Sequence, residues 1–200
     1  MDVVAKEIAP SGVLSQDQLL DLFRILAMTD EKARLSATSI FNVKPRAGGF
    51  VTRESKILVR KHKKDLLKFF GVGTGPGTTP GAKKPKFALL YRGSRDGFTA
   101  QAFHSKCDGK GPTLTVIKAQ NQQNIFGGFV QDPWHGNGSY SSNKAWLFSL
   151  VNSRNKAVKL ESNSPSNNCY MNSGYGPTWG GGHDLHVSSN MKSNSSVRAQ

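Results

Sequence analysis

The sequence predicts an α+β protein built on a two-sheet antiparallel β-sandwich with short flanking helices, preceded by a helical extension. From Phe87 to Val187, short apolar segments alternate with turns that bear Gly, Asp, Asn or Pro, a density typical of antiparallel sandwiches rather than βαβ sheets. A Gly/Pro/Thr-rich stretch, GTGPGTTPGAKK, precedes them and is typical of a linker. We therefore expect a helical N-terminal extension over 1–72, a flexible basic linker over 73–86 and a β-rich domain over 87–200.

The composition indicates a protein with a real core and no membrane span. Of the 200 residues 36% are hydrophobic, and the mean hydropathy is -0.45, while the longest apolar runs are too short to cross a bilayer. The N-terminus lacks the continuous apolar segment of a signal peptide. The two cysteines, Cys107 and Cys169, form neither a metal-binding spacing nor a disulfide framework. We expect a cytoplasmic protein with reduced thiols and no metal or cofactor.

The net charge of +14 is unevenly distributed along the chain. Most of the excess lies within residues 44–86, where only Glu54 and Asp65 oppose the cations. A basic segment of this kind is a candidate surface for nucleic acid or an anionic membrane. The alternative is a solvated helix face held to the protein by apolar residues on its other side. The candidate cations are Arg60, Lys61, Lys63 and Lys64; the candidate anchors are Leu66, Phe69 and Phe70.

Helices are expected in both parts of the chain. Ser15–Leu26 has a capping serine and an apolar stripe at helical spacing. Thr52–Phe70 has a candidate cap in Thr52 and a stop at Gly71. Residues 27–50 remain undecided because Pro45 and Gly48-Gly49 interrupt any period. A third helix is expected over residues 98–107, with Thr99 as its cap and Phe98, Ala102 and Phe103 facing inward.

The predicted strands cover residues 87–92, 113–118, 125–130, 145–151, 158–160 and 184–187. Gly127-Gly128 lies inside one of them and indicates a bulge or a close backbone approach. We expect Trp134, Trp146 and Trp179 to belong to the core.

Three short patterns are candidate sites, each with a structural alternative. Arg95-Asp96-Gly97 is either a partner surface or a tight turn in which Asp96 caps backbone N–H groups. His183-Asp184-Leu185-His186 suggests metal ligation or an acid/base pair. On a strand, however, Asp184 and His186 would face away from His183, and the pattern supplies no third ligand. The alternative is a strand entry in which Asp184 bonds the preceding turn. Gly180-Gly181-Gly182 lacks the Gly-Lys-Ser/Thr of a phosphate loop and indicates backbone flexibility.

Cys107 follows His104 in the predicted third helix. This i, i+3 pair lacks the third group that would hold a catalytic base in place. A redox thiol at Cys107 would need exposure and a lowered pKa. The alternative is a small residue with no reactivity.

Four segments in order resemble the TLDc domain, the domain of the oxidation-resistance proteins and of nuclear-receptor-coactivator relatives. They are LLYRGSRDGFTAQAFHSKCDGKGPTLTVIKA, IFGGFV, AWLFSLVN and GPTWGGGHDLHV, within a resemblance from about Phe87 to about Asn194. The resemblance implies a two-sheet sandwich and a non-catalytic role: protection against oxidative stress and, in several members, binding to the vacuolar proton pump (V-ATPase) and regulation of its assembly. The turns of the family motif contain Arg95, Asp96, Gly97, Gly111, Pro112, Gly127, Gly128, Gly180, Gly181, Gly182 and Asp184.

The chain departs from the family pattern at its end. Family members continue past the GGGHDL-type motif with a Ser/Asn-rich loop and a closing strand, whereas this sequence stops at Gln200. We therefore expect a domain without its closing strand, which leaves a sheet edge with unpaired backbone groups.

Overall fold

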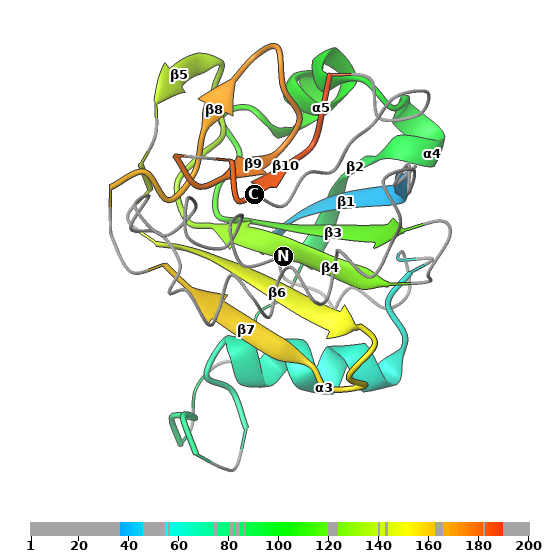
Figure 1. Cartoon of the computed structure of the whole chain (residues 1–200), viewed down its shortest axis with the longest axis vertical. Helices are drawn as coiled ribbons and strands as arrows, with labels where there is room; N and C mark the ends of the chain where they lie inside the picture. The colour runs from blue at the N-terminus through cyan, green and yellow to red at the C-terminus, as the bar shows by residue number, and fades with distance from the viewer. Residues whose placement is uncertain are drawn as a thin grey trace, which may run out of the picture.

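A six-stranded antiparallel sheet organises the molecule (Figure 1). The computed structural model describes residues 37–45, 55, 57–73, 76–80, 82, 85, 87–119, 124–139, 141–142, 144–162, 166–181 and 183–189. The strand order is β2-β1-β3-β4-β6-β7. The strands are β1 (Ala37–Pro45), β2 (Phe87–Arg92), β3 (Thr113–Ala119), β4 (Ile125–Val130), β6 (Ala145–Val151) and β7 (Val158–Glu161).

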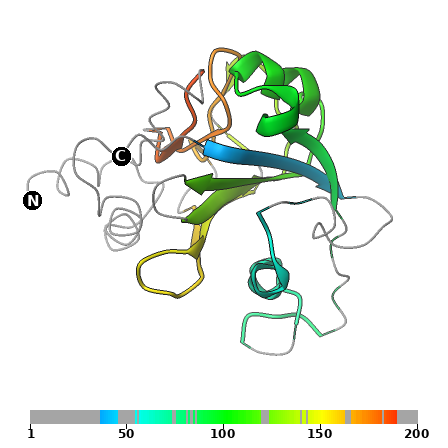
Figure 2. The same cartoon turned by 90° about the vertical axis from the view of Figure 1, so that its right-hand side faces the viewer.

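The central strands are buried on both faces, because layers cover the sheet on each side. All six residues of β4 are buried, as are six of the seven in β6. This explains why these segments read as continuous apolar runs instead of alternating ones. Figure 2 shows helix α3 on one side of the sheet and helices α4 and α5 on the other.

Helix α3 (Arg60–Phe69) covers one face of the sheet. Phe70, at its C-terminal cap, meets Phe129 and Trp146 edge to face, with ring centroids 5.3 and 5.2 Å apart. Leu66 is fully buried. The buried residues of this layer are Ile57, Leu58, Leu66, Phe87, Leu114, Val116, Ile125, Phe129, Trp146, Phe148 and Leu150.

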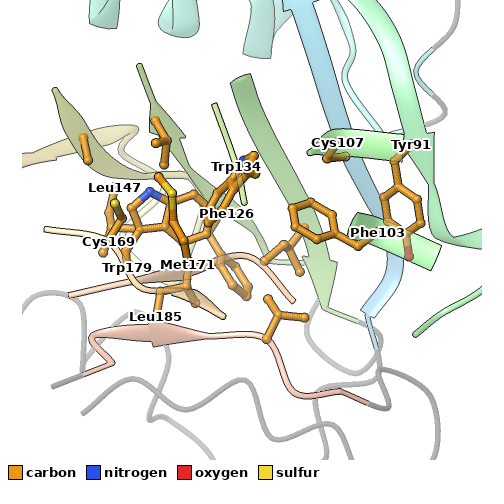
Figure 3. Close-up of a cluster of buried hydrophobic side chains, with 14 of the residues drawn as sticks. Tyr91, Phe103, Cys107, Phe126, Trp134, Leu147, Cys169, Met171, Trp179 and Leu185 are labelled. Carbon is orange, nitrogen blue, oxygen red and sulfur yellow. The ribbon is translucent and has the colours of Figure 1, made fainter. Parts of the chain in front are cut away.

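The other face carries helices α4 (Gly93–Asp96) and α5 (Ala100–Cys107) and two small antiparallel sheets. One pairs β5 (Asn137–Ser139) with β8 (Met171–Asn172), and the other pairs β9 (Thr178–Trp179) with β10 (Leu185–His186). Figure 3 shows the core under them, in which Phe103, Trp134 and Trp179 meet edge to face. The second layer of the sandwich is thus made of two short strand pairs and the helices α4 and α5.

The α+β antiparallel fold is confirmed, and several strands begin and end where the sequence predicted. The bounds of β2, β4 and β6 agree to the residue. Helix α5 begins after Thr99, whose hydroxyl accepts the Ala102 N–H at 3.1 Å, as expected. Trp134, Trp146 and Trp179 are all at most 2% exposed, so their core role is confirmed.

One prediction about the N-terminal part needs correction. The predicted helix Thr52–Phe70 was wrong at its start, because α3 begins only at Arg60. The Ser55 hydroxyl accepts the N–H groups of Ile57 and Leu58 at 3.2 and 2.9 Å, and this local turn competes with the helix. Both of these apolar side chains enter the core before the helix begins.

Strand β1 was not predicted. It lies between β2 and β3 and ends at Pro45, which pairs with Phe87 of β2 and lies beyond the part of β1 that pairs with β3. The sheet therefore takes a strand from residues that precede the predicted linker. The division at residues 72 and 86 stays a prediction. The predicted helix Ser15–Leu26 lies outside the described residues. So do residues 190–200, and the prediction that the domain lacks its closing strand therefore stays a prediction.

Candidate functional site

The Arg95-Asp96-Gly97 pattern forms a compact turn at the end of β2. Asp96 accepts the Arg92 N–H at 2.8 Å and pairs with Arg95 at 2.7 Å. The hydrogen bond from Arg95 is the main reason that the pKa of Asp96 lies below its ordinary value. Gly97 has φ +101° and accepts the Tyr91 hydroxyl at 2.6 Å. These are the contacts of the tight-turn interpretation, with the carboxylate occupied by backbone and Arg95.

Three glycines of the motif allow close approach of other chain segments. A Cβ at Gly127 would collide with the carbonyl of Thr115 on β3, and one at Gly128 with the indole of Trp179. A Cβ at Gly111 would lie 2.7 Å from the backbone nitrogen of Pro133. Gly111 is joined to Pro112 by a cis peptide. The close approach predicted for Gly127-Gly128 is confirmed.

The second glycine-bearing turn supports Asp184. Gly180 has φ +82°, and a Cβ there would collide with the Asp184 carboxylate. A Cβ at Gly181 would lie 2.8 Å from the Cβ of Asn167. Gly182 lies outside the described residues. Gly180 and Asp184 therefore pack as one unit.

Asp184 is the most perturbed carboxyl group of the structure. It is 1% exposed, and its Oδ2 has no hydrogen-bond partner in the described structure. It borders a small, mainly apolar hollow that Leu147, Leu160 and Trp179 also line. Burial raises its pKa from 3.8 to about 7, because an apolar environment disfavours the charged form. The expected bond from Asp184 to the preceding turn is not made by this oxygen.

Two histidines and two tyrosines meet on the surface of the C-terminal hairpin. The prediction that strand alternation separates His183 from His186 was wrong. His183 has φ +63° and precedes β10, so its ring stacks on that of His186 with centroids 5.2 Å apart. Tyr170 stacks on His183 at 5.1 Å, and Tyr175 meets His186 edge to face at 4.6 Å. All four residues are half-buried.

We call Tyr170, Tyr175, His183 and His186 the tyrosine–histidine cluster. Burial lowers the pKa of His183. In the described part of the chain, no three His, Cys, Asp or Glu side chains converge as a metal site would require. The sequence analysis did not find the tyrosines of the cluster. They lie five residues apart on either side of β8, with no periodic signal, and the left-handed turn at His183 places its ring against that of His186.

His104 of helix α5 forms hydrogen bonds to the segment Asn172–Tyr175. His104 Nε2 faces the carbonyls of Asn172 and Tyr175 at 3.0 and 2.9 Å, and because carbonyls only accept, this nitrogen donates. His104 Nδ1 lies 2.7 Å from Asp108 Oδ1. Nε2 thus joins α5 to β8 and the loop that follows it, while Nδ1 contacts Asp108 at the end of α5. The ring is not placed as a base for Cys107.

Both cysteines are buried. Cys107 and Cys169 are each 0% exposed, and burial raises the pKa of the Cys169 thiol to about 12. A reactive thiol needs access to its reagent. The burial of Cys107 therefore counts against a direct redox role in the folded chain.

Helix α3 turns its cations outward and its apolar residues inward. Arg60, Lys61 and Lys64 are exposed and Lys63 is half-buried. Leu66, Phe69 and Phe70 pack against the sheet, as the docked-helix interpretation expected. Among the helices that the structure describes, none is long and apolar enough to span a bilayer.

The order of these turns and strands can be compared with known families. A model of the TLDc domain family matches residues 51–200. The chain belongs to the TLDc domain family. The TLDc match includes α3, which the sequence analysis had placed in the extension, and begins after β1. No curated protein matches the chain.

Within this TLDc domain the polar motif residues serve the fold. Asp96 holds the N–H of Arg92, Asp184 packs on Gly180, and the strand glycines admit Thr115 and Trp179. The half-buried aromatic rings of the tyrosine–histidine cluster and the exposed cations of α3 are among the groups that the described residues present to solvent.

Proposed function

We propose that this chain is a non-catalytic TLDc interaction domain that acts in the cytosol. Membership of the family supports an interaction role. A non-catalytic role is supported by the contacts of the polar motif residues, which bind backbone groups and pack against turns. Asp96 is bonded to Arg92 and Arg95, and His104 is bonded on both ring nitrogens. Groups committed in this way are poorly placed to transfer protons to a substrate.

The partner that the family suggests is the V-ATPase, with protection against oxidative stress as the outcome in the cell. We propose the tyrosine–histidine cluster as the contact surface. Aromatic rings anchor interfaces because they bury a large area at a low cost in conformational entropy. Each of the four ring centroids lies at most 5.7 Å from that of a neighbouring ring. The tyrosines flank β8 and the histidines belong to β10 and the turn before it, and His104 bonds the Tyr175 carbonyl.

A pull-down with isolated V-ATPase subunits tests the proposal. The chain should retain a pump subunit, and Tyr170→Ala/Tyr175→Ala should weaken retention at least tenfold, since interface aromatics often contribute 2 kcal/mol or more on truncation (about 30-fold). Cys107→Ser should retain the subunit as the unmodified chain does, because the thiol is buried. If the intact chain retains no pump subunit, the V-ATPase proposal fails. If it is retained but the tyrosine variant binds equally well, the surface is elsewhere.

A further inference from the structure

The exposed arc of helix α3 consists of cations alone. Arg60, Lys61, Lys64 and Lys68 are exposed and, at 3.6 residues per turn, fall within about 100° of the helix circumference. The buried Leu66 lies on the opposite side. Within the described residues none of these four cations has an ion-pair partner.

This arrangement is unfavourable for the helix itself. Arg60 with Lys64, and Lys64 with Lys68, are like charges four residues apart, which repel on a helix surface. The first turn holds Arg60 and Lys61 and no acidic residue, although the positive end of the helix dipole favours acidic side chains there. Departures from local stability rules at a surface that the fold does not need are expected at functional sites. An external anion would relieve both penalties at once.

A second segment extends the basic surface. Arg154 and Lys156 are exposed in the turn between β6 and β7. The residues flanking this turn, Val151 and Ala157, pack against the same core as α3. In Figures 1 and 2 the turn and α3 both lie at the end of the molecule opposite to α4 and α5. We call Arg60, Lys61, Lys64, Lys68, Arg154 and Lys156 the basic side.

We propose that the basic side binds the surface of a membrane rich in anionic phospholipid. A planar charged surface can contact the helix and the turn at the same time, although the two are far apart in the sequence. Val59, at the N-terminal cap of α3, is 58% exposed and adds an apolar contact beside the cations. A bilayer interface accepts an exposed apolar side chain such as that of Val59, whereas a phosphate backbone offers it no partner. This apolar residue beside the cations favours lipid over nucleic acid.

Vesicle sedimentation tests this proposal, with phosphatidylcholine vesicles that either contain or lack phosphatidylserine. The chain should bind only the phosphatidylserine vesicles, and less tightly as salt is added. A cation near an anionic membrane contributes about 1 kcal/mol, or about fivefold in binding. Lys61→Gln/Lys64→Gln/Lys68→Gln should therefore bind about a hundredfold more weakly. These side chains are exposed, and equal melting temperatures would show that the fold is kept.

The control is Lys106→Gln/Lys110→Gln/Lys144→Gln, which removes the same charge from exposed positions outside α3 and the β6–β7 turn. It should bind as the unmodified chain does. Equal loss in both variants would show that net charge alone drives binding and would overturn the proposal, as would no binding to phosphatidylserine vesicles. A DNA duplex that displaces the chain from vesicles and itself requires the α3 lysines would overturn it in favour of nucleic acid.

Discussion

Replacing Asp184 by Asn should make the stability of the protein less dependent on pH. Asp184 is 1% exposed, and burial raises its pKa to about 7 in the folded chain, from 3.8. A raised pKa means that the folded state favours the protonated acid. The contribution of Asp184 to the free energy of unfolding is fully present below about pH 4 and is lost as the pH rises from about 4 to 7. It changes no further at higher pH. The full difference is on the order of 4 kcal/mol, since one pKa unit corresponds to about 1.4 kcal/mol.

Chemical denaturation of both proteins at pH 5 and pH 8 measures this effect. Asn is always neutral, so the free energy of unfolding of Asp184→Asn relative to the unmodified chain should rise by about 2.5 kcal/mol between the two pH values. Any packing or hydrogen-bonding cost of the amide is the same at both pH values and cancels in the comparison. A relative stability that stays constant within about 0.5 kcal/mol would refute the reasoning, because Asp184 would then ionise at the same pH in the folded and unfolded chains.

Three further predictions follow from the motif residues. Asp96→Asn should lower the free energy of unfolding at pH 7 by roughly 1–2 kcal/mol. Because the pKa of Asp96 is lowered in the folded chain, this loss should shrink as the pH falls below 3.8. Chemical denaturation at pH 7 and pH 3 measures it, and an equal loss at both pH values would show that the charge of the carboxylate does not matter. Gly127→Ala should lower the free energy of unfolding by at least about 3 kcal/mol, since the new Cβ would collide with the Thr115 carbonyl. Gly138→Ala should lower it by only about 1 kcal/mol, because Gly138 has a φ of +82° but no neighbour near its Cβ. Equal melting temperatures of the two variants would contradict this. Cys107 should react with a thiol reagent only after denaturation, because it is 0% exposed, and rapid labelling of the folded chain would restore the redox hypothesis.

Much of the central sheet could be predicted because each of these strands is marked by residues within or next to it. Segments such as Ile125–Val130 and Ala145–Val151 are short apolar runs closed by turn residues, and burial on both faces keeps them apolar throughout. Turn chemistry likewise identified Asp96 and Gly97 from residue type alone. In these places the information lies within a few residues of the element that it specifies.

The features that were missed depend on contacts between distant residues. Strand β1 is defined by its pairing with β2 and β3. It contains β-forming residues such as Ile40 and Val43, but the nearby Pro45 and Gly48-Gly49 are typical of a loop. The start of α3 depends on the Ser55 hydroxyl and on two buried side chains. The tyrosine–histidine cluster arises because His183 adopts a left-handed φ, which an alternating strand model excludes.

The central claim is that this TLDc domain works by binding through its outward aromatic rings while its motif residues hold the fold. Titration of the purified chain with the V-ATPase subunit that it retains measures this directly. The account predicts saturable binding that falls at least tenfold in Tyr170→Ala/Tyr175→Ala, with the melting temperature of each variant recorded alongside and the affinity of Cys107→Ser unchanged. No saturable binding to any pump subunit, or an affinity untouched by loss of both tyrosine rings, would contradict it.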